Sequence, residues 1–127
     1  MASNDSGPGA SDPRGRAETL PLQGGDCVLM VDPDAETRLA CVQAAVDEGC
    51  RPLAARSENA ATVAAENRPL VIVVAGGDAL GGVDPTDLAV SVGAQLVRWK
   101  AMGAPEQLAE RVRLGIAAAR RIRASAR

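Results

Sequence analysis

The sequence predicts a small α/β domain in which a parallel sheet of about four or five strands is covered by helices on both faces. Two observations support this prediction. Short apolar runs that favour strands alternate along the chain with segments of helical periodicity, and an apolar content of 46% in 127 residues suits one globular domain. The chain has one Trp and neither Phe nor Tyr, so Val, Leu, Ile and Ala must form the core.

The N-terminal part of the chain differs in composition from the rest. Residues 1–25 are rich in Ser, Gly, Pro and Asp, which favours a disordered tail, and we assign the domain to residues 26–127. The apolar run at 27–31 predicts a buried strand.

A helix is expected directly after this strand. Asp34 stands at its N-cap position and Gly49 follows its end, which places the helix at residues 35–48. Its large apolar residues recur at steps of three and four and indicate a helical stripe: Leu39, Val42 and Val46.

Two more strands, with a helix between them, are expected over residues 52–74. Residues 52–55 predict a weak strand, and Ser57 is expected to cap an alanine-rich helix that ends at Asn67. Five β-favouring residues at 70–74 then give the clearest strand of the sequence.

The last third begins with a glycine-rich loop at 75–82. A short helix over about 85–92 and a fourth strand at 95–99 follow. Pro105 opens a final helix whose apolar residues repeat at steps of four and three: Leu108, Val112, Ile116 and Ala119.

Composition argues against enzyme chemistry. The chain contains no His, which removes the usual general base and the commonest metal ligand. Three Cys residues without CxxC spacing favour buried reduced thiols over disulfides or zinc: Cys27, Cys41 and Cys50. We expect no catalytic residue, no metal and no cofactor.

The start of the sequence resembles a bacterial response-regulator receiver domain. Residues 28–34 (VLMVDPD), followed by an amphipathic helix ending at Gly49, are similar to the opening of that family, in which an acidic pair binds Mg²⁺. Residues 57–61 and 68–74 resemble its second helix and third strand.

The resemblance extends to the position of the family's phosphorylated aspartate. It places that position on Ala75, whose methyl group cannot accept a phosphoryl group. Residues 93–100 resemble the fifth strand with its closing lysine, here Lys100, and 105–108 resemble the start of the fifth helix. The segment between Ala75 and Gly93 is too short for the family's full complement of elements, so one β/α unit is expected to be missing.

Asp32 and Asp34 are the candidate remnants of an acidic pocket, together with Lys100. Carboxylates at the carboxyl ends of parallel strands are where such folds place their chemistry. Pro33 occupies the second position of the expected acidic pair, however, and Asp34 is explained as an N-cap. The glycine loop lacks the residues of a Walker motif.

Positive charge is concentrated at the C-terminus. The chain has a net charge of -2, yet from Arg98 onward eight basic residues face two acidic ones. Arg111, Arg120 and Arg121 are candidates for an interface with an acidic protein. A solvated helix face explains them equally well, and nucleic-acid binding is disfavoured because no aromatic residue accompanies them.

Trp99 is the only aromatic residue, and two roles are open for it. Packing in the core is the simpler one. If exposed, it would be the anchor of a protein interface, since Trp is favoured at such positions.

These features predict a phosphorylation-independent, receiver-like adaptor in bacterial signalling or regulation, with another protein as partner. Its docking face would be formed by the fourth strand, Trp99, Lys100 and the final helix. A sensor of small anions or nucleotides is the alternative, and a homodimer stays open. We expect a cytoplasmic protein without membrane contact, because the sequence has neither a signal-peptide pattern nor a spanning apolar run.

Overall fold

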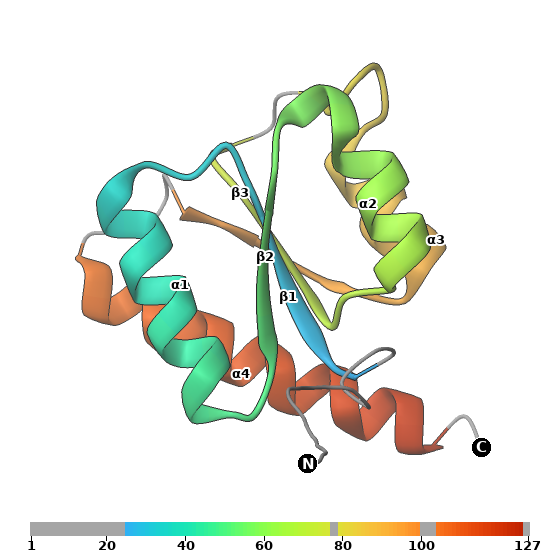
Figure 1. Cartoon of the computed structure of the whole chain (residues 1–127). Coiled ribbons are helices and arrows are strands. Elements are labelled where there is room, and N and C mark those ends of the chain that lie inside the picture. Colours follow the sequence, from blue (N-terminus) through green and yellow to red (C-terminus); the bar gives the residue numbers. More distant parts are fainter. Residues whose placement is uncertain (1–24, 77–78, 100–103, 126–127) are drawn as a thin grey trace, which may run out of the picture.

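A computed structural model describes residues 25–76, 79–99 and 104–125, and the proposed N-terminal tail lies outside this part except for residue 25. Four strands form one parallel sheet in the order β2-β1-β3-β4 (Figure 1). The strands are β1 (Cys27–Val31), β2 (Arg51–Ala55), β3 (Val71–Val74) and β4 (Gln95–Arg98). The helices are α1 (Ala35–Asp47), α2 (Ala60–Asn67), α3 (Pro85–Val92) and α4 (Pro105–Ser125), and a 3-10 helix, η3 (Ser57–Asn59), precedes α2.

The central strands are β1 and β3, and every residue in both is buried. Val28 is in register with Pro52 on one side and with Val71 on the other. Burial on both faces of the sheet explains why these two strands are continuous apolar runs in the sequence.

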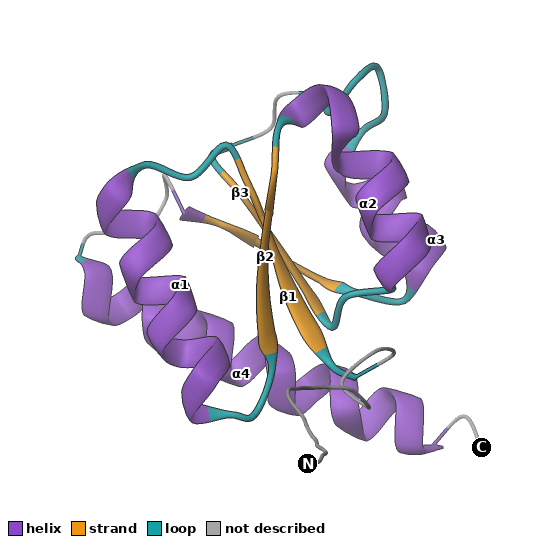
Figure 2. Cartoon of the chain, in the orientation of Figure 1, coloured by secondary structure: helices purple, strands orange, loops and turns teal. Residues whose placement is uncertain are grey.

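Two helices cover each face of the sheet (Figure 2). Val28 and Met30 belong to the core cluster under α1 and α4, and Leu29 and Val31 belong to the cluster under α2 and α3. Successive side chains of a strand point to opposite faces, so β1 contributes to both halves of the core. The predicted α/β class is therefore confirmed, as a small flavodoxin-like sheet with four strands.

The final helix agrees with the sequence prediction in its start and in its buried stripe. Pro105 is its first residue, and the four predicted core positions are all buried: Leu108, Val112, Ile116 and Ala119. Trp99 and β4 lead into this helix, which packs closely along α1.

Helix α1 is present as predicted, but the prediction that its large apolar residues face the core is wrong for two of them. Leu39 is 68% exposed and Val46 60% exposed. The buried face consists of small side chains instead: Thr37, Ala40, Cys41, Ala44 and Ala45. Small residues allow a helix to approach its neighbours closely, so Leu39 and Val46 are left on the outside, whereas Val42 of the predicted stripe is partly buried against the core.

The thiols of all three cysteines are free and buried. Burial raises the pKa of the Cys41 thiol to about 12, and it also raises the pKa of Cys27 and of Cys50. Among the described helices, none combines the length and apolar character needed to cross a bilayer.

Candidate functional site

The carboxyl ends of β1 and β3 meet at one edge of the sheet. Asp32 follows β1 and Ala75 follows β3, and both line a pocket of about 140 Å³. Ser57 and Gly76 also line it. The structure thus brings Asp32 and Ala75 together at the place where parallel sheets bind ligands. Lys100, which was expected in an acidic pocket with Asp32 and Asp34, lies outside the described residues.

The Asp32 carboxylate is engaged by the backbone of the next element. Its Oδ2 accepts a hydrogen bond of 3.0 Å from the N–H of Ser57, the first residue of η3. The Asp32 N–H donates to the carbonyl of Ala55 at 2.9 Å. With a φ of +46°, Asp32 adopts the left-handed conformation, which Asp tolerates better than most residues.

This contact corrects the capping role expected of Ser57. The sequence predicted that Ser57 would cap a continuous helix, but Ser57 lies within a 3-10 turn and its N–H is itself capped by Asp32. The cap therefore comes from the end of another strand, a relation that local sequence does not reveal.

Asp34 is an N-cap, as the sequence predicted. Its Oδ1 accepts a 2.7 Å hydrogen bond from the N–H of Thr37, and this bond lowers the pKa of the Asp34 carboxyl. Asp32 and Asp34 line different pockets, because Asp34 borders one shared with Trp99 and Pro105. The described part of the chain contains no group of three or more His, Cys, Asp or Glu side chains placed to hold a metal ion.

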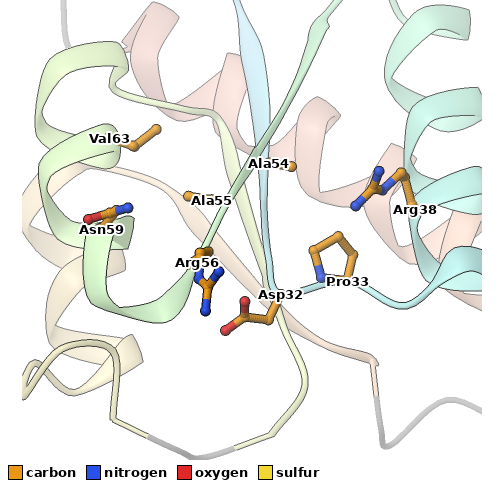
Figure 3. Close-up of a pocket in the computed structure, with 8 residues that line it drawn as sticks. All are labelled: Asp32, Pro33, Arg38, Ala54, Ala55, Arg56, Asn59 and Val63. Atoms are coloured by element: carbon orange, nitrogen blue, oxygen red, sulfur yellow. The ribbon is translucent and has the colours of Figure 1, made fainter.

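A larger, open pocket of about 440 Å³ lies next to β2 (Figure 3). Asp32, Pro33 and Arg56 lie at one end of it, with Arg38 on the α1 side and Asn59 on the opposite side. The Arg56 side chain pairs with Glu58 at 3.3 Å, and both side chains are mostly exposed. The contribution of this exposed ion pair to folding is small.

Trp99 is half-buried against the core cluster of α1 and α4. Its indole borders a pocket of about 120 Å³ between the first turns of these helices, together with Thr37 and Leu108. The Nε1 atom is buried and has no hydrogen-bond partner in the described residues. The indole therefore contributes to core packing.

Three arginines of α4 are engaged within the domain. Arg120 donates from Nε to Asp26 Oδ2 at 3.0 Å and from Nη2 to the Glu48 carbonyl at 2.8 Å. Arg113 pairs with Asp47 at 3.0 Å. These contacts connect α4 to the end of α1 and to the start of β1.

Arg123 makes the most extensive of these contacts. Its Nη2 donates to three backbone carbonyls, at 2.9 Å to Pro69, 3.2 Å to Val92 and 3.3 Å to Gly93. Charged donors satisfy carbonyls left open at the end of a helix, here α3. Sequence reasoning missed this role, because 30 or more residues separate Arg123 from its acceptors.

Arg111 and Arg121 are different: both are exposed, and the side chain of neither forms a hydrogen bond or ion pair with another described residue. Of the three interface candidates, Arg120 thus supports the fold, whereas Arg111 and Arg121 carry charge at the surface. Arg98, at the end of β4, donates to the Thr86 hydroxyl at 3.1 Å.

A shallow groove of about 240 Å³ follows β4 where α4 crosses it. Its lining includes Leu96 of β4 and four residues of α4: Arg111, Leu114, Gly115 and Ala118. Large apolar side chains remain exposed beside it, with Leu114 at 54% and Ile122 at 58%. We call this region the β4–α4 surface and define it by Leu96, Arg98, Arg111, Leu114, Ala118 and Ile122.

The apolar half of this surface was missed in the sequence, although a signal exists there. Leu114, Ala118 and Ile122 recur at steps of four, which forms a second stripe on α4 beside the core stripe. This second stripe leaves Leu114 and Ile122 exposed to solvent. Comparisons with family models, with curated proteins and with solved structures find no match for this chain.

Proposed function

We propose that this chain is a protein-interaction module, a phosphorylation-independent adaptor that works in the cytoplasm and binds its partner through the β4–α4 surface. The observation that carries the proposal is the exposure of Leu114, which lines the groove along the edge strand β4, and of Ile122 further along the same apolar stripe of α4. Apolar side chains gathered next to an open sheet edge favour a macromolecular contact over simple solvation.

The pocket between Asp32 and Ala75 supports independence from phosphorylation. Ala75 offers a methyl group where the resemblance to receivers expects the accepting carboxylate. The Asp32 carboxylate caps Ser57, and Asp34 caps α1, so both are engaged in folding. We propose that this edge of the sheet is structural and that the β4–α4 surface is functional.

Trp99 and Arg120, both candidates for the docking face, fit the proposal in a supporting role. Trp99 packs between the starts of α1 and α4, and Arg120 fastens α4 to the domain. Arg111 and Arg121 provide exposed positive charge, which favours an acidic partner.

The test of the interface uses the purified chain as bait in an extract of its native cells. We expect a partner that Leu114→Glu loses and that Val46→Glu, a matched change at an exposed position of α1, retains. Equal capture by both variants, or loss by Val46→Glu alone, would contradict the proposed surface.

The test of phosphorylation independence is separate. Incubation with acetyl phosphate and Mg²⁺ should leave the mass unchanged, and beryllofluoride should leave the amide resonances around Asp32 unshifted. A phosphorylated Asp would refute this part of the proposal. Thermal stabilisation by nucleotides or small anions would instead favour the ligand-sensing alternative.

A further inference from the structure

The two edges of the sheet differ in the backbone groups that they offer. In β2, the backbone N–H of Arg51 donates to the carbonyl of Asp26, on the side of β1. The backbone groups of successive strand residues point to opposite sides, so those of Pro52 and Ala54 point away from the sheet. Proline has no N–H, so Ala54 is the one outward donor in β2. A proline in this position protects an edge against a further strand.

The β4 edge lacks this protection. The N–H of Gln95 donates to the Leu70 carbonyl at 2.8 Å, toward β3. Leu96 and Arg98 therefore direct both their N–H and their C=O groups outward. No described strand pairs with this side of β4, which ends the sheet.

A groove reaches β4 beside α4, and apolar groups of both neighbouring helices lie near this strand. Gly115 brings α4 close to the sheet, since a Cβ there would lie 3.1 Å from Val71 Cγ2 and 3.6 Å from Gln95 Cβ. On the other face, Val90 is 76% exposed and lies one turn after Thr86, which contacts Arg98. An added strand would thus have apolar contacts on both of its faces.

Two binding partners are conceivable for this edge, a second copy of the chain and a segment of another protein, and the charge at the edge favours the second. Arg98 and Arg111 are exposed here, and the groove beside β4 has no acidic residue in its lining. A second copy of the chain would bring the same two positive charges to the same interface, which costs free energy. A partner segment with carboxylates would gain favourable pairs with them.

We infer that β4 binds an extended, acidic segment of a partner protein as a fifth strand. The backbone groups of Leu96 and Arg98 would pair with the segment, and the Arg98 and Arg111 side chains would select its charge. Peptide recognition by strand addition obtains affinity from main-chain hydrogen bonds in this way. The inference rests on the proposed function, because it specifies what the β4–α4 surface binds.

The first experiment is an amide NMR titration of the full chain with a short capped peptide in which Glu alternates with Val. We expect saturable shifts at Leu96 and Arg98 and slower hydrogen exchange of their amides. Two control peptides should have no effect, one with Lys in place of Glu and one N-methylated at alternate backbone nitrogens. Absence of binding by the acidic peptide, or equal binding by the N-methylated one, would overturn the inference.

The second experiment introduces a proline into each of the two edge strands in turn. Leu96→Pro removes an outward N–H from β4, and Ala54→Pro removes one from β2. Thermal unfolding would first establish that both variants fold. Binding of the acidic peptide should be lost in the first and unchanged in the second, and the reverse pattern would refute strand addition at β4.

Two charge-reversal variants keep the inference testable if Leu96→Pro does not fold. Arg111→Glu should weaken the affinity for the acidic peptide roughly fivefold to tenfold, because a favourable exposed ion pair becomes a repulsive one. Arg38→Glu, the same change near β2, should have no effect, and equal weakening by both would contradict the inference.

Two further outcomes separate this inference from the proposal on which it rests. If the peptide does not bind but Leu114→Glu still loses the captured partner, the β4–α4 surface is still supported as the binding surface and strand addition is refuted. If the chain forms a dimer that Leu96→Pro dissociates, β4 pairs with a second copy and the inference of an acidic partner is wrong.

Discussion

Asp32 Oδ2 accepts a hydrogen bond of 3.0 Å from the backbone N–H of Ser57, a residue 25 positions further along the chain. The contact joins the end of β1 to the start of η3, so a carboxylate at the carboxyl edge of the sheet serves as a cap. A group with this task contributes to the stability of the loop after β2, and its removal should be measurable as a change in folding.

Asp32→Ala should lower the free energy of unfolding by about 1–2 kcal/mol, because the cap is lost and alanine tolerates a positive φ poorly. Asp32→Asn should cost less, since Asn retains an acceptor oxygen and accepts this conformation. Urea unfolding of both variants checks the difference, and equal losses would argue against the cap.

The Asp34 cap should give stability a dependence on pH. The pKa of this carboxyl is lower in the folded chain than its ordinary value, because it accepts a hydrogen bond from Thr37. The stabilisation is therefore complete above the pKa of the unfolded chain and is lost as pH falls through the folded pKa. The difference in unfolding free energy between wild type and Asp34→Asn should shrink over that acidic window, and a difference independent of pH would contradict the role.

Arg123→Ala should destabilise the domain by about 1–3 kcal/mol, since three carbonyls lose a charged donor. Arg121→Ala is the matched control, because Arg121 is exposed and should change stability by less than about 0.5 kcal/mol. Chemical denaturation compares the two, and similar values would show that the Arg123 contacts contribute little.

Cys41 should resist alkylation in the folded protein. Burial raises the pKa of its thiol to about 12, so the reactive thiolate is scarce at neutral pH. Mass spectrometry after iodoacetamide treatment should find Cys41 unmodified in buffer and modified in guanidinium chloride. Rapid labelling of the native chain would indicate frequent opening of the α1 face.

Gly115→Val should destabilise the chain by about 1–3 kcal/mol. A Cβ at this position already lies 3.1 Å from the buried Val71 side chain, and two methyl groups would add to the overlap. Ala124→Val, at an exposed position of α4, controls for the lower helix propensity of valine. Equal midpoints of thermal unfolding would show that α4 can shift away from the sheet at little cost.

The sequence was most informative where burial and periodicity coincide. In α4 the large residues Val112 and Ile116 face the core, so their spacing predicted the buried stripe correctly. In α1 the core face is made of alanine, which carries little hydrophobic signal, and the more apolar Leu39 and Val46 point outward. Periodicity therefore identified both helices but oriented only one of them.

The candidate site was predictable in its position and less so in its contacts. Alternating elements predicted a parallel sheet, whose strand ends lie at one edge, and the structure places Asp32 and Ala75 in one pocket there, whereas Asp34 lines another. The Arg120 and Arg123 contacts could not be predicted, because their acceptors are carbonyls and carboxylates brought near only by the packing of α4. Most basic residues of this helix looked equivalent in sequence, yet tertiary structure separates them into anchors and free surface charges.

Pro52 limits the size of any assembly that this sheet can enter. Growth of a fibre by repeated strand addition requires that each subunit extend the sheet in two directions, and a subunit with one blocked edge ends the process. A second copy paired through β4 would leave only two edges of the β2 kind facing solvent, whereas a partner segment bound to β4 would itself form the new outer edge. A dimer formed through β4 is therefore expected to have a fixed stoichiometry and to remain a discrete particle at high concentration.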